Sequence, residues 1–172
     1  NPMSLLSVPR AKECCFELNS TSKSLNMPGW RIGMLAGNPE LISYVLKAKS
    51  NVDSGMFKPM QMAAAKALEA DKDWYDGINS VYRARRKYAE AILDYIGCTY
   101  DKSQVGLFMW GKIPASYKSC EEVADKILYD CRVFVTPGFI FGSNGDRYIR
   151  ISLCSTEEKL SEALQRIKEN LK

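Results

Sequence analysis

The chain has 172 residues, of which 46% are hydrophobic and 26% are charged. This composition supports one large domain or parts of two, each with an apolar core. No run reaches the roughly 18 consecutive apolar residues of a membrane-spanning helix, so we expect a water-soluble protein with no membrane partner. The net charge is +4, and Lys and Arg alternate with Asp and Glu along most of the chain. This mildly basic balance does not indicate a nucleic-acid partner.

Histidine is absent from the sequence. Its absence excludes the Ser-His-Asp and Cys-His mechanisms and the common histidine general base. The six cysteines are scattered and form no CxxC pair, so we predict no zinc or other metal site. We interpret them as reduced, mostly buried thiols of a cytoplasmic protein. Any chemistry must then depend on Lys, Tyr, Asp, Glu, Ser or a bound cofactor.

Two short strands that enclose a polar loop are the first predicted elements. The β-favouring run CCFELN at Cys14–Asn19 is the first strand, and WRIGMLAG, which closes at Gly37, contains the second. Lys23 lies on the loop between them. The chain reaches the first strand soon after Asn1, with no basic and apolar leader. We therefore predict no signal peptide and expect the chain to be part of a longer protein.

Three helices are predicted after the second strand. The first begins at Asn38, which can cap it, with Pro39 in the first turn. The Met- and Ala-rich run from Pro59 to about Ala70 indicates a buried helix. The third helix runs from Trp74 to about Ile96. Its apolar residues are spaced three or four positions apart, with gaps of one helical turn, so they form one stripe. This stripe comprises Trp74, Ile78, Val81, Tyr88, Ile92 and Tyr95.

Strands and helices alternate in the remainder. After the strand GLFMW, Ser119 and a glutamate three residues later can start a helix as a capping box. The strand CRVFV, the turn-rich segment TPGFIFGSNGD and the strand RYIRISL follow, and a last helix opens with Ser155 and Glu158 in a second capping box. This order indicates a small α/β lobe. Because a long helix often links two lobes, we predict two domains, residues 1–73 and 74–172.

The segment YRARRKYAE at Tyr82–Glu90 is the one dense basic cluster in the sequence. It lies within the long helical pattern. We interpret it as a solvated helix face and not as a phosphate-binding stripe, because basic blocks that bind nucleic acid normally recur across a whole surface.

The loop around Lys23 has residue types that suit a phosphorylated cofactor and a reactive amine. A lysine that forms a Schiff base needs an apolar site or a cationic neighbour, because either favours the neutral amine. Arg31 supplies a neighbouring cation and a charged fork for a phosphate, and nearby hydroxyls supply neutral donors. The hydroxyls belong to Ser20, Thr21, Ser22 and Ser24. An ordinary surface loop followed by a Gly-Pro turn is the alternative interpretation.

The segment STSKSLNMPGWRIG resembles the pyridoxal-phosphate attachment signature of class I and II aminotransferases of fold type I. The small residues before the lysine match, as do Met27, Gly29, Arg31, Ile32 and Gly33. The resemblance implies that Lys23 forms the Schiff base with pyridoxal 5'-phosphate and is the catalytic residue. It also implies that Arg31 and Ser20 bind the phosphate of the cofactor, with help from Ser22.

A second segment, PGFIFGSNGDRYIRISL, looks like the family's substrate segment, in which an arginine followed two residues later by serine binds the substrate carboxylate. Here that arginine is Arg150. Strand alternation independently places Tyr148, Arg150 and Ser152 on one face and the intervening isoleucines on a buried face. Standing alone, Arg150 would be interpreted as a salt-bridged strand arginine. Arg147 lies in the turn beside Asp146 and is expected to face solvent.

The resemblance covers essentially the whole chain and implies an α/β fold: the end of the large cofactor-binding domain, then the small C-terminal domain. It implies transfer of an amino group between an amino acid and a 2-oxo acid, in a homodimer when full length. The segment SNVDSGMFKP stands where family members reach the neighbouring site. Gly138, Phe139 and Phe141 are expected to border the substrate.

The family's ring-nitrogen carboxylate and stacking aromatic residue come from segments before the lysine strand, and only 22 residues precede Lys23. We therefore expect this chain alone to be inactive, and the cofactor to be absent from it if the missing half is needed for binding. A C-S lyase or decarboxylase of the same fold, and the sensor domain of an aminotransferase-like transcription regulator, remain alternatives. Arg150 slightly favours a substrate with an intact α-carboxylate. A structural module with degraded motifs is disfavoured by the intact signature.

Overall fold

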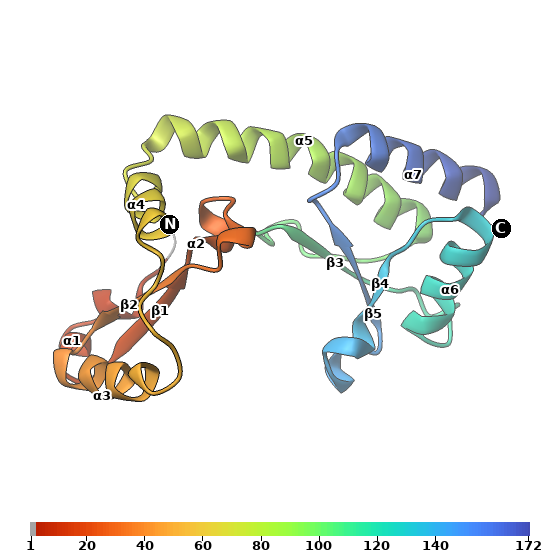
Figure 1. Ribbon diagram of the computed structural model, residues 1–172. Helices are drawn as coiled ribbons and strands as arrows, with labels where there is room; N and C mark the ends of the chain where they lie inside the picture. The colour runs from red at the N-terminus through yellow and green to blue at the C-terminus, as the bar shows by residue number, and fades with distance from the viewer. Residues whose placement is uncertain (1–2) are drawn as a thin grey trace. The chain divides into compact units, whose positions relative to one another are not determined.

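The computed structural model describes residues 3–172, which divide after Asp71 into two compact units (Figure 1). The residues up to Asp71 are called the first unit, and Lys72–Lys172 the second unit. No helix in the described range is both long enough and apolar enough to cross a membrane.

The first unit contains one antiparallel pair of strands, in which Ser20 pairs with Gly33 at the end where the chain reverses. The strands are β1 (Phe16–Ser20) and β2 (Gly33–Gly37). The helices are α1 (Ala11–Cys14), α2 (Thr21–Ser24), α3 (Pro39–Ser50) and α4 (Lys58–Ala67). The two predicted strands are therefore present, although each is shorter than its apolar run.

Helix α3 begins as the sequence predicts. The side-chain oxygen of Asn38 accepts a hydrogen bond from the amide of Leu41 at 3.0 Å, and Pro39 occupies the first turn. Helix α4 is also present, but its predicted burial is wrong, because only Ala64 is buried. Met62 on the same helix is 62% exposed.

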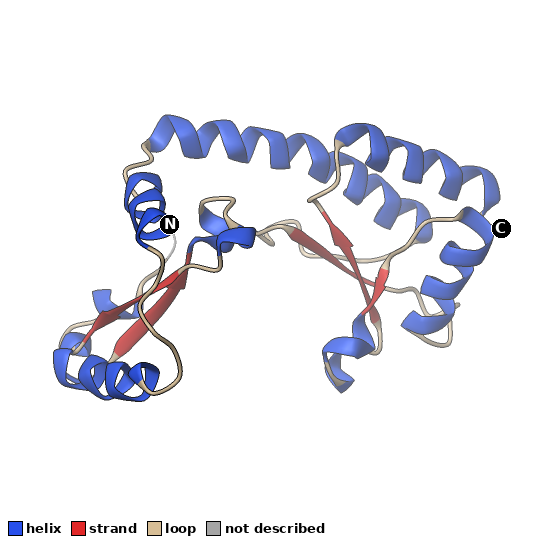
Figure 2. Cartoon of the chain, in the orientation of Figure 1, coloured by secondary structure: helices blue, strands red, loops and turns tan. Residues whose placement is uncertain are grey.

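The second unit is a three-stranded antiparallel sheet with three long helices (Figure 2). The strand order is β3-β5-β4, so β5 is central. The strands are β3 (Phe108–Lys112), β4 (Thr136–Pro137) and β5 (Tyr148–Ser152). The helices are α5 (Lys72–Ile96), α6 (Cys120–Cys131) and α7 (Glu157–Asn170).

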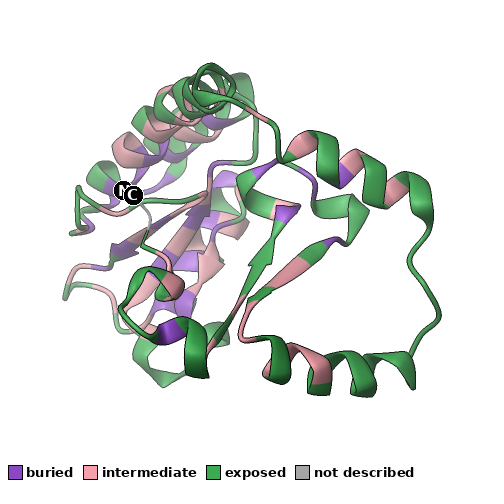
Figure 3. Cartoon of the chain, turned by 90° about the vertical axis from the view of Figure 1, so that its left-hand side faces the viewer, coloured by how far each residue is buried: buried purple, intermediate pink, exposed green. Residues whose placement is uncertain are grey.

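One face of this sheet forms the main core with residues from all three long helices. Met109, Ile149 and Ile151 lie on this face in one cluster with Ile92 of α5 and Ile127 of α6. Figure 3 shows buried positions gathered on these strands and helices, whereas α3 of the first unit has none. Successive strand residues alternate between the two faces of a sheet. The side chains of β3 and β5 that do not enter the core therefore lie on the opposite face.

Of the predicted stripe of the long helix only Ile92 is buried, and Tyr95, in the last third of the helix, is exposed. Buried positions on α5 start at Ala89, whereas Trp74 is 36% and Val81 is 40% exposed. The 3.6-residue period is therefore present, but the sheet and α7 cover only the C-terminal end of the helix.

Two local predictions in the second unit are wrong. The segment CRVFV is not a strand, because Cys131 still belongs to α6 and Arg132 ends that helix with a positive φ of 57°. The strand β4 follows it as only two residues. Helix α7 is capped by Thr156 and not by Ser155, and the Thr156 hydroxyl accepts from the amide of Lys159. In contrast, the hydroxyl of Ser119 caps α6 as predicted.

The basic cluster on α5 is not fully solvated. Arg86 donates from Nε to the carboxylate of Glu90 at 2.8 Å and from Nη1 to the carbonyl of Gln104 at 2.5 Å. Arg85 donates to the carbonyl of Leu153 at 3.1 Å. These arginines therefore tie the helix to loops of the second unit, which corrects the interpretation of a solvated face.

The cysteines form no disulfide among the described residues, and fewer of them are buried than predicted. Cys98, Cys120 and Cys131 are buried, whereas Cys14 and Cys154 are exposed. Burial raises the pKa of the Cys98 thiol from 9.0 to about 12.

Alkylation at pH 9 tests this division of the thiols. Iodoacetamide reacts with the thiolate, so we expect the exposed Cys154 to be modified in the native chain and Cys98 to be protected both by burial and by its raised pKa. Peptide mass spectrometry with and without urea measures the difference. Equal modification of Cys98 and Cys154 in the native chain would contradict the packing of the second unit.

Two glycines of the second unit give opposite predictions. Gly77 lies inside α5 with open space at its Cβ position, so Gly77→Ala should stabilise the unit by up to about 1 kcal/mol. A Cβ at Gly138 would lie 2.3 Å from the carbonyl oxygen of Gly145 and 2.6 Å from that of Tyr148. Gly138→Ala must therefore displace backbone, at a cost of about 1–3 kcal/mol. Urea unfolding measures both, and a Gly138→Ala variant as stable as the wild type would show that this turn is packed differently.

Candidate active site

The turn that carries Lys23 is held by one buried residue, Thr21. Its amide and its hydroxyl both donate to the carbonyl oxygen of Ile32, at 3.2 and 3.0 Å. The carbonyl oxygen of Thr21 accepts from the amides of Leu25 and Met27, at 3.2 and 3.3 Å. Thr21 thus links the start of the turn to Leu25 and Met27 within the turn, and to Ile32, the residue before β2.

The apolar side chains of this turn point inward and leave the lysine exposed. Leu25, Met27 and Ile32 are buried, whereas Lys23 is exposed. The sequence predicts a loop at Lys23, but Lys23 lies on the one-turn helix α2. The helical turn starts there because the hydroxyl of Ser20 accepts a hydrogen bond from the amide of Ser22.

Arg31 lies at the same end of the strand pair as Ser20, because it precedes β2 by two residues and Ser20 pairs with Gly33. Its backbone is left-handed, with φ of 53°, and its guanidinium donates to the carbonyl oxygen of Pro28 at 3.0 Å. The guanidinium is exposed and forms no ion pair among the described residues. Most of its N–H donors therefore stay available to an anion.

The donors at this end of the sheet fit a phosphate. Arg31 offers a planar charged fork, and the hydroxyl of Ser20 can still donate, because in the structure it only accepts from the Ser22 amide. The hydroxyl of Ser24, in contrast, donates to the carbonyl oxygen of Ser20. The first unit thus brings Ser20, Ser22, Lys23 and Arg31 to one end of the β1-β2 pair.

Arg150 belongs to the second unit, where it lies on the central strand β5. It pairs with Trp110 of β3 on one side and with Thr136 of β4 on the other. The burial of β5 alternates, so that Ile149 and Ile151 enter the core and Arg150 does not. The facing predicted from strand alternation is therefore confirmed.

Two aromatic rings lie against the guanidinium of Arg150. Its central carbon is 4.2 Å from the ring centre of Phe108 and 4.4 Å from that of Phe141. Trp110 meets Phe141 edge-on, with ring centres 5.3 Å apart. The Nε atom of Arg150 is buried without a hydrogen-bond partner. Unlike an ordinary strand arginine, Arg150 forms no ion pair within the described range.

Arg147 does not face solvent, which corrects the expectation for it. Its guanidinium is half-buried and donates to the carbonyl oxygens of Tyr117 at 2.7 Å, Lys118 at 3.0 Å and Pro114 at 2.8 Å. A fourth contact, to the carbonyl oxygen of Ile113, is 3.5 Å long. Arg147 therefore organises the loop before α6 and has few donors left for a ligand.

Sequence reasoning did not single out Phe108 and Trp110. It counted the buried hydroxyl of Thr21 among the donors for a phosphate, whereas in the structure that hydroxyl donates to the carbonyl oxygen of Ile32. The alternation of FMWGK places Phe108 and Trp110 on one face, and that pattern could have found them once β3 was paired with β5. Nothing in the sequence separates Thr21 from the other hydroxyls of the loop, because its role depends on burial and on the position of Ile32.

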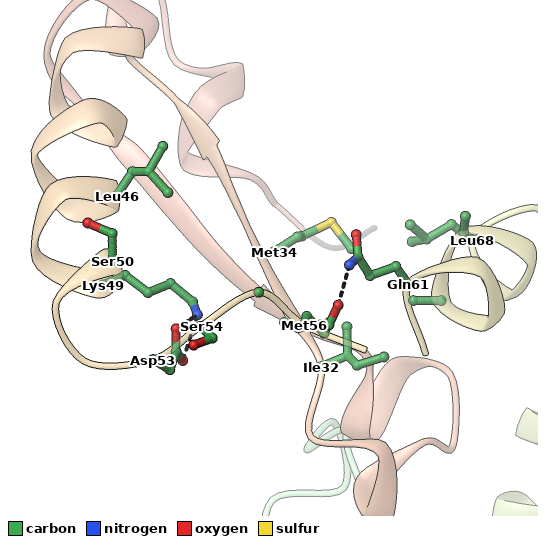
Figure 4. Close-up of a pocket in the computed structure, with 14 residues that line it drawn as sticks. Ile32, Met34, Leu46, Lys49, Ser50, Asp53, Ser54, Met56, Gln61 and Leu68 are labelled. Carbon is green, nitrogen blue, oxygen red and sulfur yellow. Dashed lines mark hydrogen bonds and ion pairs between the residues drawn. The ribbon is translucent and has the colours of Figure 1, made fainter. Parts of the chain in front are cut away.

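A hollow of about 590 Å³ in the first unit was also not anticipated. It lies between β2, α3, the segment that follows α3, and α4 (Figure 4). Its walls are mostly apolar, and its polar edge carries the ion pair of Lys49 with Asp53 and the hydrogen bond from Gln61 to the carbonyl of Met56. None of the predicted site residues lines this hollow.

Comparisons with known proteins agree with this architecture. The family described as aminotransferase class I and II matches residues 4–167. The chain belongs to that family. Members of this family generally depend on pyridoxal phosphate. The predicted fold class, the α/β C-terminal part of a fold type I aminotransferase, is therefore confirmed.

Relatives with similar sequences are longer than this chain. An LL-diaminopimelate aminotransferase of Aquifex aeolicus is 43% identical over 171 residues, which make up 99% of this chain and 44% of that protein. Among solved structures, apo BacF from Bacillus subtilis has a TM-score of 0.87 and 36% identity, over 98% of this chain and 45% of that one. A probable N-succinyldiaminopimelate aminotransferase from Thermus thermophilus has a TM-score of 0.85 and 32% identity, over 96% and 44%. The chain thus spans less than half the length of these relatives.

The variant Thr21→Val tests what holds the lysine turn. Removing the hydroxyl loses one buried hydrogen bond, worth about 1 kcal/mol, with little change in shape. We expect the amide hydrogens of Leu25 and Met27 to exchange about fivefold faster, because both donate to Thr21. Ser24→Ala, which removes an exposed hydroxyl of the same turn, is the control and should leave their exchange unchanged. Unchanged exchange in Thr21→Val would show that Thr21 does not hold the turn.

Proposed function

We propose that this chain is the C-terminal part of a pyridoxal-phosphate-dependent aminotransferase, which transfers an amino group between an amino acid and a 2-oxo acid. The observation that carries this proposal is the turn fixed by Thr21, which sets Lys23 and Arg31 at one end of the β1-β2 pair. The similarity to aminotransferases over nearly the whole chain supports it.

Within this proposal each site residue has a distinct task. Arg31 and Ser20 hold the phosphate of the cofactor, with help from Ser22. The Nζ atom of Lys23 would hold the cofactor, and the same amine would move a proton at the α-carbon of the substrate. Arg150 binds the substrate carboxylate. Pyridoxal phosphate, when bound, supplies the electron sink for the charge that develops at that carbon.

The two units correspond, in this proposal, to the end of the large domain (1–73) and to the small domain (74–172). The carboxylate and the aromatic residue that act on the cofactor ring come from the half that relatives carry before this segment. The 172-residue chain alone is therefore inactive. The complete protein is a cytoplasmic homodimer, in which SNVDSGMFKP, at Ser50–Pro59, reaches the neighbouring site.

Transamination is preferred over the other reactions of this fold. Lys23 and Arg31 would serve a C-S lyase or a decarboxylase equally well, but the relatives cited above are named aminotransferases. A transcription regulator is disfavoured for the same reason. The name LL-diaminopimelate aminotransferase makes a diamino dicarboxylic acid the first amino donor to assay.

Borohydride trapping on the full-length protein tests the cofactor assignment. With pyridoxal phosphate bound, we expect a visible absorption band that Lys23→Ala abolishes, and reduction should fix the cofactor on Lys23 as shown by peptide mass mapping. Lys12→Ala, an exposed lysine of the same unit, is the control and should keep the band. Arg31→Gln should weaken cofactor binding by about tenfold or more, through the loss of a charge-assisted phosphate contact.

The proposal fails if the full-length protein forms no such band, or if the label maps to another lysine. Formation of the band without amino transfer to any 2-oxo acid would instead favour the lyase or decarboxylase.

A further inference from the structure

We infer that Phe108 and Phe141 are positioning residues for Arg150, and that their rings hold its guanidinium with the two terminal nitrogens turned toward a carboxylate. This inference rests on the proposed function for the identity of the carboxylate as part of the substrate. It goes beyond that function by assigning positioning roles to two phenylalanines.

The two rings restrict the guanidinium through its faces. Both ring centres lie within 4.4 Å of the central carbon of Arg150, which is well inside the roughly 6 Å range of cation–π contacts. Phe108 comes from β3 and Phe141 from the 3-10 turn Gly138–Phe141, so two separate segments supply the rings. The guanidinium is therefore held by contacts that leave its hydrogen-bonding edge unused.

The aromatic ring of Phe141 is itself supported. Trp110 meets it edge-on at 5.3 Å, and Tyr148 lies 6.4 Å from Trp110 between ring centres. Trp110 is the residue opposite Arg150 in the strand register. An aromatic cluster thus surrounds the arginine on the open face of the sheet, where surrounding water would otherwise hydrate the cation.

Burial of Nε determines how a carboxylate can approach. An arginine can bind a carboxylate side-on, through Nε and one terminal nitrogen, or end-on, through both terminal nitrogens. The Nε atom of Arg150 is enclosed and has no partner, so an incoming oxygen cannot reach it without displacing the surrounding residues. The terminal nitrogens have no partner among the described residues and are not enclosed in this way. End-on binding is what remains.

The absence of an internal counter-ion explains why such a site binds an anion. A partly desolvated cation with no acidic partner is costly, and a carboxylate ligand removes that cost while forming charge-assisted hydrogen bonds. The rings lower the cost in the empty site through their negative faces. They also keep the fork in one orientation, which reduces the conformational entropy lost on binding.

Propionate, a minimal carboxylate, is the probe for this site, and no cofactor is added. In nitrogen-15 NMR of the chain, we expect the terminal-nitrogen signals of Arg150 to shift on titration and the Nε–H signal to remain slow to exchange with water. Arg150→Gln should abolish the binding. Phe108→Leu and Phe141→Leu should each weaken it about 3- to 10-fold.

Conservative variants separate positioning from folding. Phe108→Tyr and Phe141→Tyr keep the aromatic face, so both should bind within about twofold of the wild type. Phe134→Leu is the matched control, because Phe134 is 70% exposed and has no ring contact with Arg150 among the described residues. Urea unfolding of each variant verifies that the second unit is folded, and a Leu variant that is unfolded is replaced by the corresponding Met variant.

Wild-type affinity in both folded Leu variants would overturn the positioning role, and an Nε–H shift as large as that of the terminal nitrogens would overturn end-on binding. Binding that survives in Arg150→Gln would overturn the site itself. Because the titration contains no cofactor, its outcome is independent of trapping at Lys23. A failed trap with a positive titration would leave a carboxylate-binding module that is not an aminotransferase.

Discussion

Arg31 and Arg150, the two arginines proposed to bind anions, form no ion pair with an acidic residue in the part of the chain that the structure describes. The free-energy cost of leaving each cation without an acidic partner is met in a different way at each arginine. Arg31 is exposed, with one bond to the carbonyl oxygen of Pro28, so water can hydrate it when no anion is bound. Arg150 is partly enclosed, and the rings of Phe108 and Phe141 take the place of water. An arginine paired internally, as Arg86 is with Glu90, would have no such capacity for a ligand.

The backbone of Arg150 belongs to a regular strand, whereas Arg31 lies in the short irregular segment before β2. Arg150 lies on the central strand of its sheet, where neighbours on both sides fix its backbone. The segment that carries Arg31 is tied down at the next residue by the two hydrogen bonds from Thr21 to the carbonyl oxygen of Ile32, and Thr21 also opens the turn that carries Lys23. The fold thus supplies orientation and charge, and these are the contributions that the protein makes in an enzyme whose chemistry is carried by a cofactor.

Features determined by neighbouring residues were predictable from the sequence, and features determined by distant ones were not. Asn38 caps α3 as predicted, because the cap, the proline and the helix are adjacent. The facing of Arg150 followed from strand alternation. The burial of α4, the contacts of Arg147 and the ring of Phe108 over Arg150 all depend on segments remote in sequence. The tight ending of α6 at Arg132 was missed because its left-handed backbone is unusual for arginine.

A crystal structure of the full-length protein with a reduced phosphopyridoxyl-amino acid adduct would test the central claim, that these two arginines receive the two anionic ends of the reacting species. The account predicts the phosphate on Arg31 and Ser20, and the carboxylate on the two terminal nitrogens of Arg150, between the rings of Phe108 and Phe141. A phosphate bound elsewhere, or a carboxylate held by other residues, would contradict it.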